Sequence, residues 1–147
     1  MLSPLCVHWQ FFPACRIRIC AWFRNKVRSH RHNLAHDSHN ICVAGSSDED
    51  MAVAVNTLIS MQGGLVVVKN KKGIFQVAFP IAGLLSNLPA KKLSAQLRML
   101  AEAACTIGCT LPEPFQQLSF LALPVIPHLK LTAKGLWDVD VFQHIKA

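Results

Sequence analysis

The residue types best suited to chemistry lie together just before the first apolar run of the chain. His36, Asp37, Ser38, His39 and Asn40 place a base, a carboxylate, a hydroxyl and an amide within five positions. A catalytic triad uses such groups, but its members must meet in space, and neighbours in sequence usually point apart. The residues alone therefore favour a polar turn, because Asp, Ser and Asn bond readily to their own backbone. A catalytic site is the second interpretation.

Two further pairs have the spacing of metal ligands. His30 and His32 form an H-x-H pair, but no strand pattern surrounds them to point both rings to one side. Cys105 and Cys109 come at the end of an expected helix, where both sulfurs would share one face. Spacing places no third ligand near either pair, and cysteine commonly packs as a small hydrophobe. The residues thus predict no metal site in this chain.

The positive charge is concentrated at the start of the chain. The formal net charge is +7 over 147 residues, and residues 1–32 hold six Lys or Arg and no acid. The other 115 residues hold nine basic and eight acidic side chains, so the basic balance is poor evidence for a nucleic-acid partner. Arg16 and Arg18 interrupt the early apolar stretch, so we expect no membrane span there. We also expect no secretory signal, because the positive charge follows the apolar stretch rather than preceding it. We expect residues 1–33 to be a basic, irregular leader, with a transit peptide as the alternative.

Residues 34–147 are expected to form one domain with an α+β fold. The hydrophobic fraction of 52% is sufficient for a core, and strand and helix patterns alternate along the chain. The expected architecture is a mixed β-sheet layer with two main helices packed on it. The expected elements are a strand at 41–45, a helix from Ser47 to Gly63-Gly64, a hairpin of 65–68 with 74–79, a helix from Pro89 to about Ile107, an ambiguous apolar segment at 115–123 and a short extended piece at 129–131.

Ordered motifs in this part of the sequence resemble the C-terminal domain of bacterial adenine deaminase. The resemblance covers residues 35 to about 142 and fails before about residue 33. The motifs, in order, are Ala35–Ile41, Asp48–Asn56, Gly63–Val68, Pro80–Leu84, Leu118–Pro127, Leu129–Thr132 and Lys134–Leu136.

That resemblance implies a metal-dependent amidohydrolase that converts adenine and water to hypoxanthine and ammonia. In such enzymes a metal-bound hydroxide attacks the carbon that bears the amine, and iron or manganese sits at the mouth of a (β/α)₈ barrel. A barrel needs roughly 200 residues or more by itself, and none of its motifs is present here. The resemblance therefore implies a C-terminal domain that does not deaminate adenine unaided and holds no cofactor of its own.

The resemblance also implies where this domain would meet the rest of an intact enzyme. We expect the segment from His36 to Asn40 to face the barrel mouth and to help close the adenine pocket. Ser119 and Phe120 are a second candidate contact, and the apolar run around them also fits a homo-oligomer. The expected location is the cytoplasm. Two alternatives stay open: a non-catalytic interaction module or gene remnant that pairs with a separate barrel chain, and a nucleic-acid binder that acts through its leader.

Overall fold

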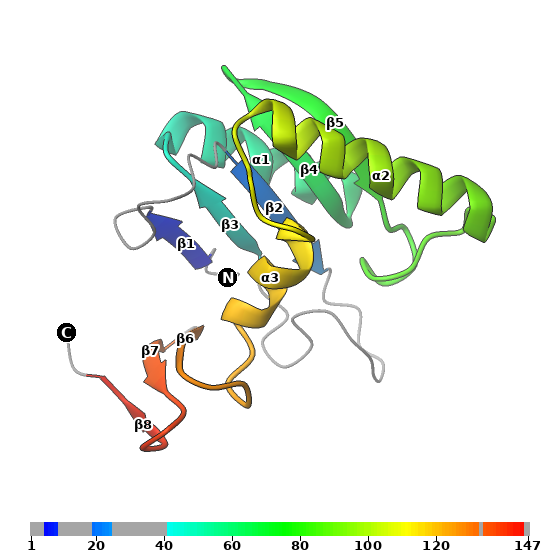
Figure 1. Cartoon of the computed structure of the whole chain (residues 1–147). Helices are drawn as coiled ribbons and strands as arrows, with labels where there is room; N and C mark the ends of the chain where they lie inside the picture. The colour runs from blue at the N-terminus through cyan, green and yellow to red at the C-terminus, as the bar shows by residue number, and fades with distance from the viewer. Residues whose placement is uncertain (1–4, 9–18, 25–40, 133, 146–147) are drawn as a thin grey trace.

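Two β-sheets and three helices make up the described part of the chain (Figure 1). The computed structural model describes residues 5–8, 19–24, 41–132 and 134–145. No helix within these ranges is long and apolar enough to cross a membrane. The α+β class predicted from the sequence is confirmed.

A five-stranded mixed sheet forms the centre of the structure. Its strand order is β1-β3-β2-β4-β5, with β1 parallel to β3 and every other neighbouring pair antiparallel. The strands are β1 (Leu5–His8), β2 (Ile19–Arg24), β3 (Cys42–Gly45), β4 (Gly63–Lys69) and β5 (Lys72–Ala78). β1 and β2 lie within residues 1–33, a segment in which the sequence shows no strand pattern. Whether that segment is separate from the domain stays a prediction.

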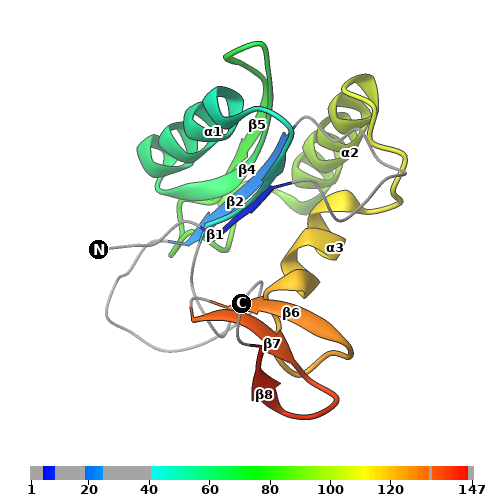
Figure 2. The same ribbon diagram turned by 90° about the vertical axis from the view of Figure 1, so that its left-hand side faces the viewer.

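The two main helices cover opposite faces of this sheet (Figure 2). Helix α1 (Asp48–Met61) packs Ala54 and Leu58 with Val66 and Val68 of β4. On the other face, α2 (Ala90–Thr106) and α3 (Pro114–Leu121) form a core with Leu65, Val67 and Val77. Successive side chains of a strand point to opposite sides, so β4 contributes to both cores. This explains why β4 is a nearly continuous apolar run.

Helix α1 begins as the sequence predicts and ends differently. The Ser47 hydroxyl accepts a hydrogen bond from the Asp50 backbone N–H, which satisfies one free donor of the first turn. We expected Gly63-Gly64 to end the helix, but Gln62 ends it in a left-handed conformation and both glycines belong to β4. A Cβ on Gly64 would lie 2.1 Å from the Val77 carbonyl oxygen, so this glycine allows the strands to approach.

The predicted hairpin is confirmed, and a two-residue turn joins β4 to β5. Asn70 and Lys71 both have positive φ angles, 54° and 61°, as a type I′ turn requires. The Asp50 carboxylate accepts hydrogen bonds from both backbone amides, at 3.2 Å from Asn70 and 2.5 Å from Lys71. Asp50 is buried. The Asp50 side chain therefore ties α1 to the hairpin.

The C-terminal part forms a second, smaller sheet beside α3. The ambiguous segment at 115–123 is mostly helix α3, whose first residue is Pro114. The three strands that follow are antiparallel, in the order β6-β7-β8. They are β6 (Leu129–Thr132), β7 (Gly135–Asp138) and β8 (Gln143–His144). The predicted extended piece at 129–131 thus belongs to this C-terminal sheet.

Candidate functional site

The main candidate segment of the sequence, His36 to Asn40, lies outside the described residues. The described chain resumes at Ile41, which is buried and leads directly into β3. The predicted role of the segment at a barrel mouth therefore stays a prediction.

The second candidate pair lies on the last two turns of α3. Ser119 is buried, and its hydroxyl donates a hydrogen bond of 2.7 Å to the Gln116 carbonyl oxygen of its own helix. Phe120 is 40% exposed. The two side chains therefore differ: the serine is satisfied within the helix, and the phenylalanine offers an apolar surface. Contact of either residue with a substrate or a second domain stays a prediction.

Polar residues converge on an open hollow of about 490 Å³ between the start of α1 and the hairpin turn. Ser47, Glu49, Asp50, Asn70 and Lys71 help to line it. Each oxygen of the Asp50 carboxylate is already bonded to a turn amide. Lys71 and Glu49 form an exposed ion pair of 3.8 Å. These contacts hold the helix and the hairpin together, so the hollow is a structural junction rather than an assembled site.

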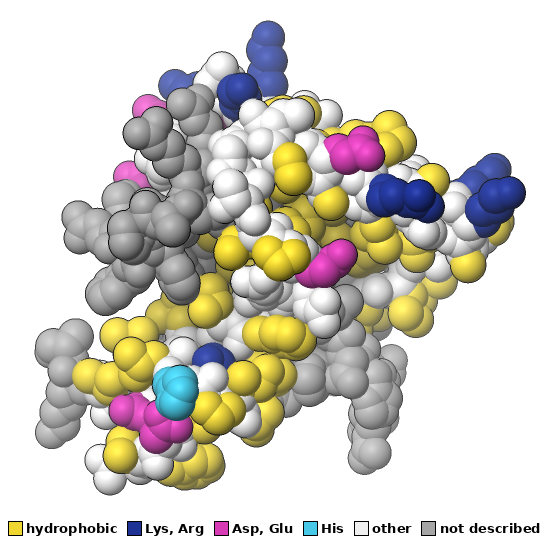
Figure 3. All heavy atoms as spheres, viewed as in Figure 1, with side chains coloured by type: hydrophobic (Ala, Val, Ile, Leu, Met, Phe, Trp, Pro, Cys, Tyr) yellow, Lys and Arg dark blue, Asp and Glu magenta, His cyan; other side chains and the backbone are white. Residues whose placement is uncertain are grey.

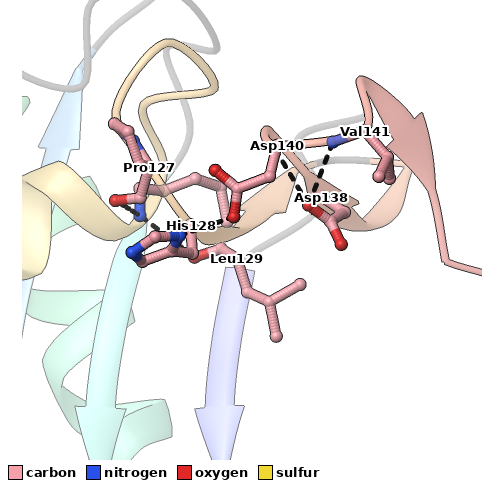
Figure 4. A network of polar contacts seen from close by, with 7 residues as sticks. Pro127, His128, Leu129, Asp138, Asp140 and Val141 are labelled. Atoms are coloured by element: carbon pink, nitrogen blue, oxygen red, sulfur yellow. Dashed lines mark hydrogen bonds and ion pairs between the residues drawn. The ribbon is translucent and has the colours of Figure 1, made fainter.

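A histidine–aspartate pair lies at the end of the C-terminal sheet where β6 begins and β7 ends (Figure 4). His128 Nδ1 lies 2.5 Å from Asp140 Oδ2, and both side chains are at least half exposed. Asp138 Oδ1 accepts hydrogen bonds from the backbone amides of Asp140 and Val141. Within the described contacts no hydroxyl or thiol is bonded to His128, so the pair lacks the nucleophile of a triad. The His128–Asp140 contact joins the residue before β6 to the loop after β7.

Metal ligands do not gather in the part of the chain that the structure describes. No group of three or more His, Cys, Asp or Glu side chains there could hold a metal ion. The cysteine pair also differs from its prediction, since α2 ends at Thr106, between Cys105 and Cys109. Cys105 is exposed and Cys109 is buried, so the two sulfurs do not share a helix face. That these cysteines hold no metal stays a prediction.

Thiol labelling at pH 8 is expected to separate Cys105 from Cys42. Burial raises the pKa of the Cys42 thiol to about 11, so it stays neutral and inaccessible. We expect a thiol-specific reagent to modify the exposed Cys105 within minutes and to reach Cys42 only in urea, as followed by mass spectrometry. Because the folded protein keeps this proton when the unfolded chain loses it, Cys42 also predicts a fall in stability as the pH rises toward 11. Rapid labelling of Cys42 in folded protein would contradict the buried β3 strand.

The fold and its contacts define a small α+β domain in which the described residues assemble no catalytic centre. The family model of the adenine deaminase C-terminal domain matches residues 30–143. The chain therefore belongs to the adenine deaminase C-terminal domain family, as its motifs predict.

Curated relatives support the same assignment. The chain is 57% identical over 108 residues to an adenine deaminase of Methylobacterium nodulans, and 54% identical over 112 residues to one of Brucella anthropi. It is 53% identical over 112 residues to adenine deaminase 1 of Rhizobium meliloti. These matches cover 74–76% of this chain but only 19–20% of each relative. The chain thus spans about a fifth of the length of the relatives it matches.

Sequence reasoning did not predict the surroundings of three polar side chains. Asp50 ties α1 to the hairpin, Lys130 is buried, and the Trp137 indole nitrogen is buried without a partner among the described residues. Lys130 lies between two leucines of β6, and a single charged residue between apolar neighbours was the signal that could have drawn attention to it. The partners of Asp50 are twenty residues away, and no local pattern indicates them.

Proposed function

We propose that this chain is the C-terminal domain of an adenine deaminase and acts with a metal-bearing amidohydrolase barrel. In the intact enzyme the reaction is the hydrolysis of adenine to hypoxanthine and ammonia, in purine salvage or catabolism in the cytoplasm. The observation that carries this proposal is the match over residues 30–143 to a domain that makes up a fifth of each relative. A barrel of roughly 200 residues or more fits in the remainder of such a relative.

The metal of the family, manganese or iron, belongs in this proposal to the barrel. The described residues do not fit a metal of their own, since their donors do not form a cluster of three. In the barrel, the metal would supply the activation of water that hydrolysis requires. No step of the reaction is assigned to a side chain of this domain.

The proposed contribution of the domain is to help close the adenine pocket. In this proposal the segment from His36 to Asn40 faces the barrel mouth, and Phe120 provides a second contact beside the buried Ser119. The segment enters the sheet at the start of β3, whose four residues are all buried. A strand held in this way gives a rigid base to the residues that precede it, as a functional loop requires.

An ammonia-release assay tests the proposal. We expect the purified chain with manganese or iron to release no ammonia from adenine. A hybrid in which this chain replaces the matching segment of the M. nodulans adenine deaminase is expected to turn over adenine. Turnover by the chain alone would contradict the proposal, and so would an inactive hybrid that folds and binds metal like its parent. An intact partner enzyme that co-purifies with the chain would instead favour a separate interaction module.

In the hybrid, the double substitution of His36 and His39 by Ala tests the proposed loop. We expect a raised KM for adenine, because the loop would help to close the pocket rather than take part in the chemistry. The matched control is His128→Ala, an exposed histidine of the C-terminal sheet. Unchanged kinetics in the double variant would remove the loop from the site.

A further inference from the structure

The C-terminal sheet has two chemically different sides. The side that carries Trp137 packs against other residues of the same chain. Lys130 is opposite Trp137, and Trp137 is opposite His144, so these three side chains share one side. The Trp137 ring lies edge-on to Phe142 and to His144, with ring centroids 4.9 Å and 4.8 Å apart. Lys130 is 7% exposed, and its ammonium donates to two backbone carbonyl oxygens. This side is packed within the chain.

The second side of the sheet is aliphatic and open. Leu131 is opposite Leu136, and Leu129 and Ile145 lie on the same side of the sheet. We call these four residues the aliphatic side. Leu129 is 50% exposed, Ile145 42% and Leu136 38%. Figure 3 shows hydrophobic side chains gathered over the C-terminal sheet. Adjoining exposed aliphatic side chains of this kind mark a surface that another protein surface covers.

The same sheet also has an incomplete hydrogen bond. The indole nitrogen of Trp137 is buried and has no acceptor among the described residues. Buried polar groups in native proteins nearly always have a partner, so each exception needs an explanation. This donor lies on the packed side of the sheet, so the open aliphatic side is a separate observation.

We infer that the aliphatic side is the surface on which this domain docks against the rest of a full-length adenine deaminase; this inference rests on the proposed function. The match covers 19% of the M. nodulans relative, so most of that chain lies outside the matching segment. Among the described residues of the three strands, no basic residue lies on this side of the sheet. The polar residues there are Asp138 and Gln143, and Asp138 Oδ1 accepts hydrogen bonds from two backbone amides. The surface that covers it is therefore apolar, rather than a nucleic acid or an acidic protein.

The size of the aliphatic side favours a tethered partner over a second copy of the chain. Stable complexes between separate proteins bury about 800 Å² on each partner, with roughly 20–30 residues a side. Four aliphatic residues are well short of that number. A covalent link between the two surfaces raises their effective concentration to the millimolar range or so. A small apolar surface is therefore sufficient within one full-length chain.

Photo-crosslinking in the hybrid enzyme tests this surface. A benzophenone amino acid replaces Leu129 in one variant and Ile59 in the other, since Ile59 lies on α1 with a similar exposed fraction of 52%. We expect the probe at position 129 to crosslink to residues outside the grafted segment at several times the yield of the probe at 59. Crosslinks from 129 that stay within the segment, or that join two hybrid chains, would overturn the inference.

A second pair of variants keeps the inference testable if the hybrid is unstable. In the isolated 147-residue chain, Leu129→Lys and Ile59→Lys are both expected to leave Tm within about 2 °C of the parent, because each side chain is half exposed. At position 129 the new ammonium would also lie opposite Asp138. A much lower Tm for Leu129→Lys alone would show that the aliphatic side is already covered in this chain, which would overturn the inference.

The two proposals fail in different ways. If the hybrid crosslinks from position 129 to the parent portion but does not turn over adenine, the docking surface stands and the proposed function fails. If the hybrid turns over adenine and Leu129→Lys leaves its Tm and its activity unchanged, the proposed function stands and the docking surface fails.

Discussion

Substitution of Gly64 by Ala is expected to destabilise the protein by about 4 kcal/mol or more, which is most of the free energy of unfolding of a marginally stable domain. The new Cβ would lie 2.1 Å from the Val77 carbonyl oxygen and 3.0 Å from the Ala78 Cα, both parts of the backbone. Gly64 also has a φ of +137°, which side chains rarely adopt. Because β4 lies between β2 and β5, neither neighbouring strand can move away freely. Urea denaturation and soluble yield measure the effect.

Gly73→Ala is the matched control for this substitution. Gly73 lies on β5, and a Cβ there meets nothing within 4 Å. We expect its unfolding free energy to change by less than about 1 kcal/mol, with a gain favoured because alanine loses less backbone entropy than glycine. Equal losses at Gly64 and Gly73 would contradict the close approach of β4 and β5.

Substitution of Asp50 by Ala is expected to lower the unfolding free energy by about 2–3 kcal/mol. The change removes a buried carboxylate that accepts from the Asn70 and Lys71 amides and also lies in the first turn of α1. The turn it holds is unusual, because Lys71 adopts a positive φ that glycine normally supplies. Asp50→Asn is expected to lose about half as much, since one carbonyl oxygen can accept where two oxygens did.

Glu49→Ala is the neighbouring control for Asp50. Glu49 is exposed, and its contact with the Lys71 ammonium is an exposed ion pair of 3.8 Å. Such pairs contribute at most about 1 kcal/mol, so we expect a small change in the urea midpoint. A large loss in Glu49→Ala with little loss in Asp50→Ala would show that the surface pair, and not the buried carboxylate, joins α1 to the hairpin.

Local patterns predicted the central elements of the fold because each depends on nearby residues. Ser47 before a run with helical spacing predicted the start of α1, and β-branched runs on either side of a polar turn predicted the β4–β5 hairpin. The ambiguous run at 115–123 needed tertiary context, because a short apolar segment fits a helix or a strand equally well. The positions of α1 and α2 on opposite faces also depend on which side of β4 each helix meets.

Less of the candidate site could be predicted, because its contacts join residues far apart in the sequence. The Asp50 carboxylate accepts hydrogen bonds from amides 20 and 21 positions further along, which no local pattern indicates. The cysteine pair was expected on one helix face, but α2 ends at Thr106, so Cys105 and Cys109 separate. The family assignment succeeded for another reason: several motifs in a fixed order identify a relative without any knowledge of contacts.

The position of β2 has a consequence for any shortened version of this protein. The family match begins at residue 30, but β2 spans Ile19–Arg24 and lies between β3 and β4. A fragment that begins at residue 30 would lack β2. The backbone amides and carbonyls of β3 and β4 that pair with β2 would then have no partner. Open edges of this kind recruit strands from other molecules. The boundary that evolutionary similarity suggests is therefore a poor place to cut, and a crystallisation or binding fragment should keep the first 29 residues.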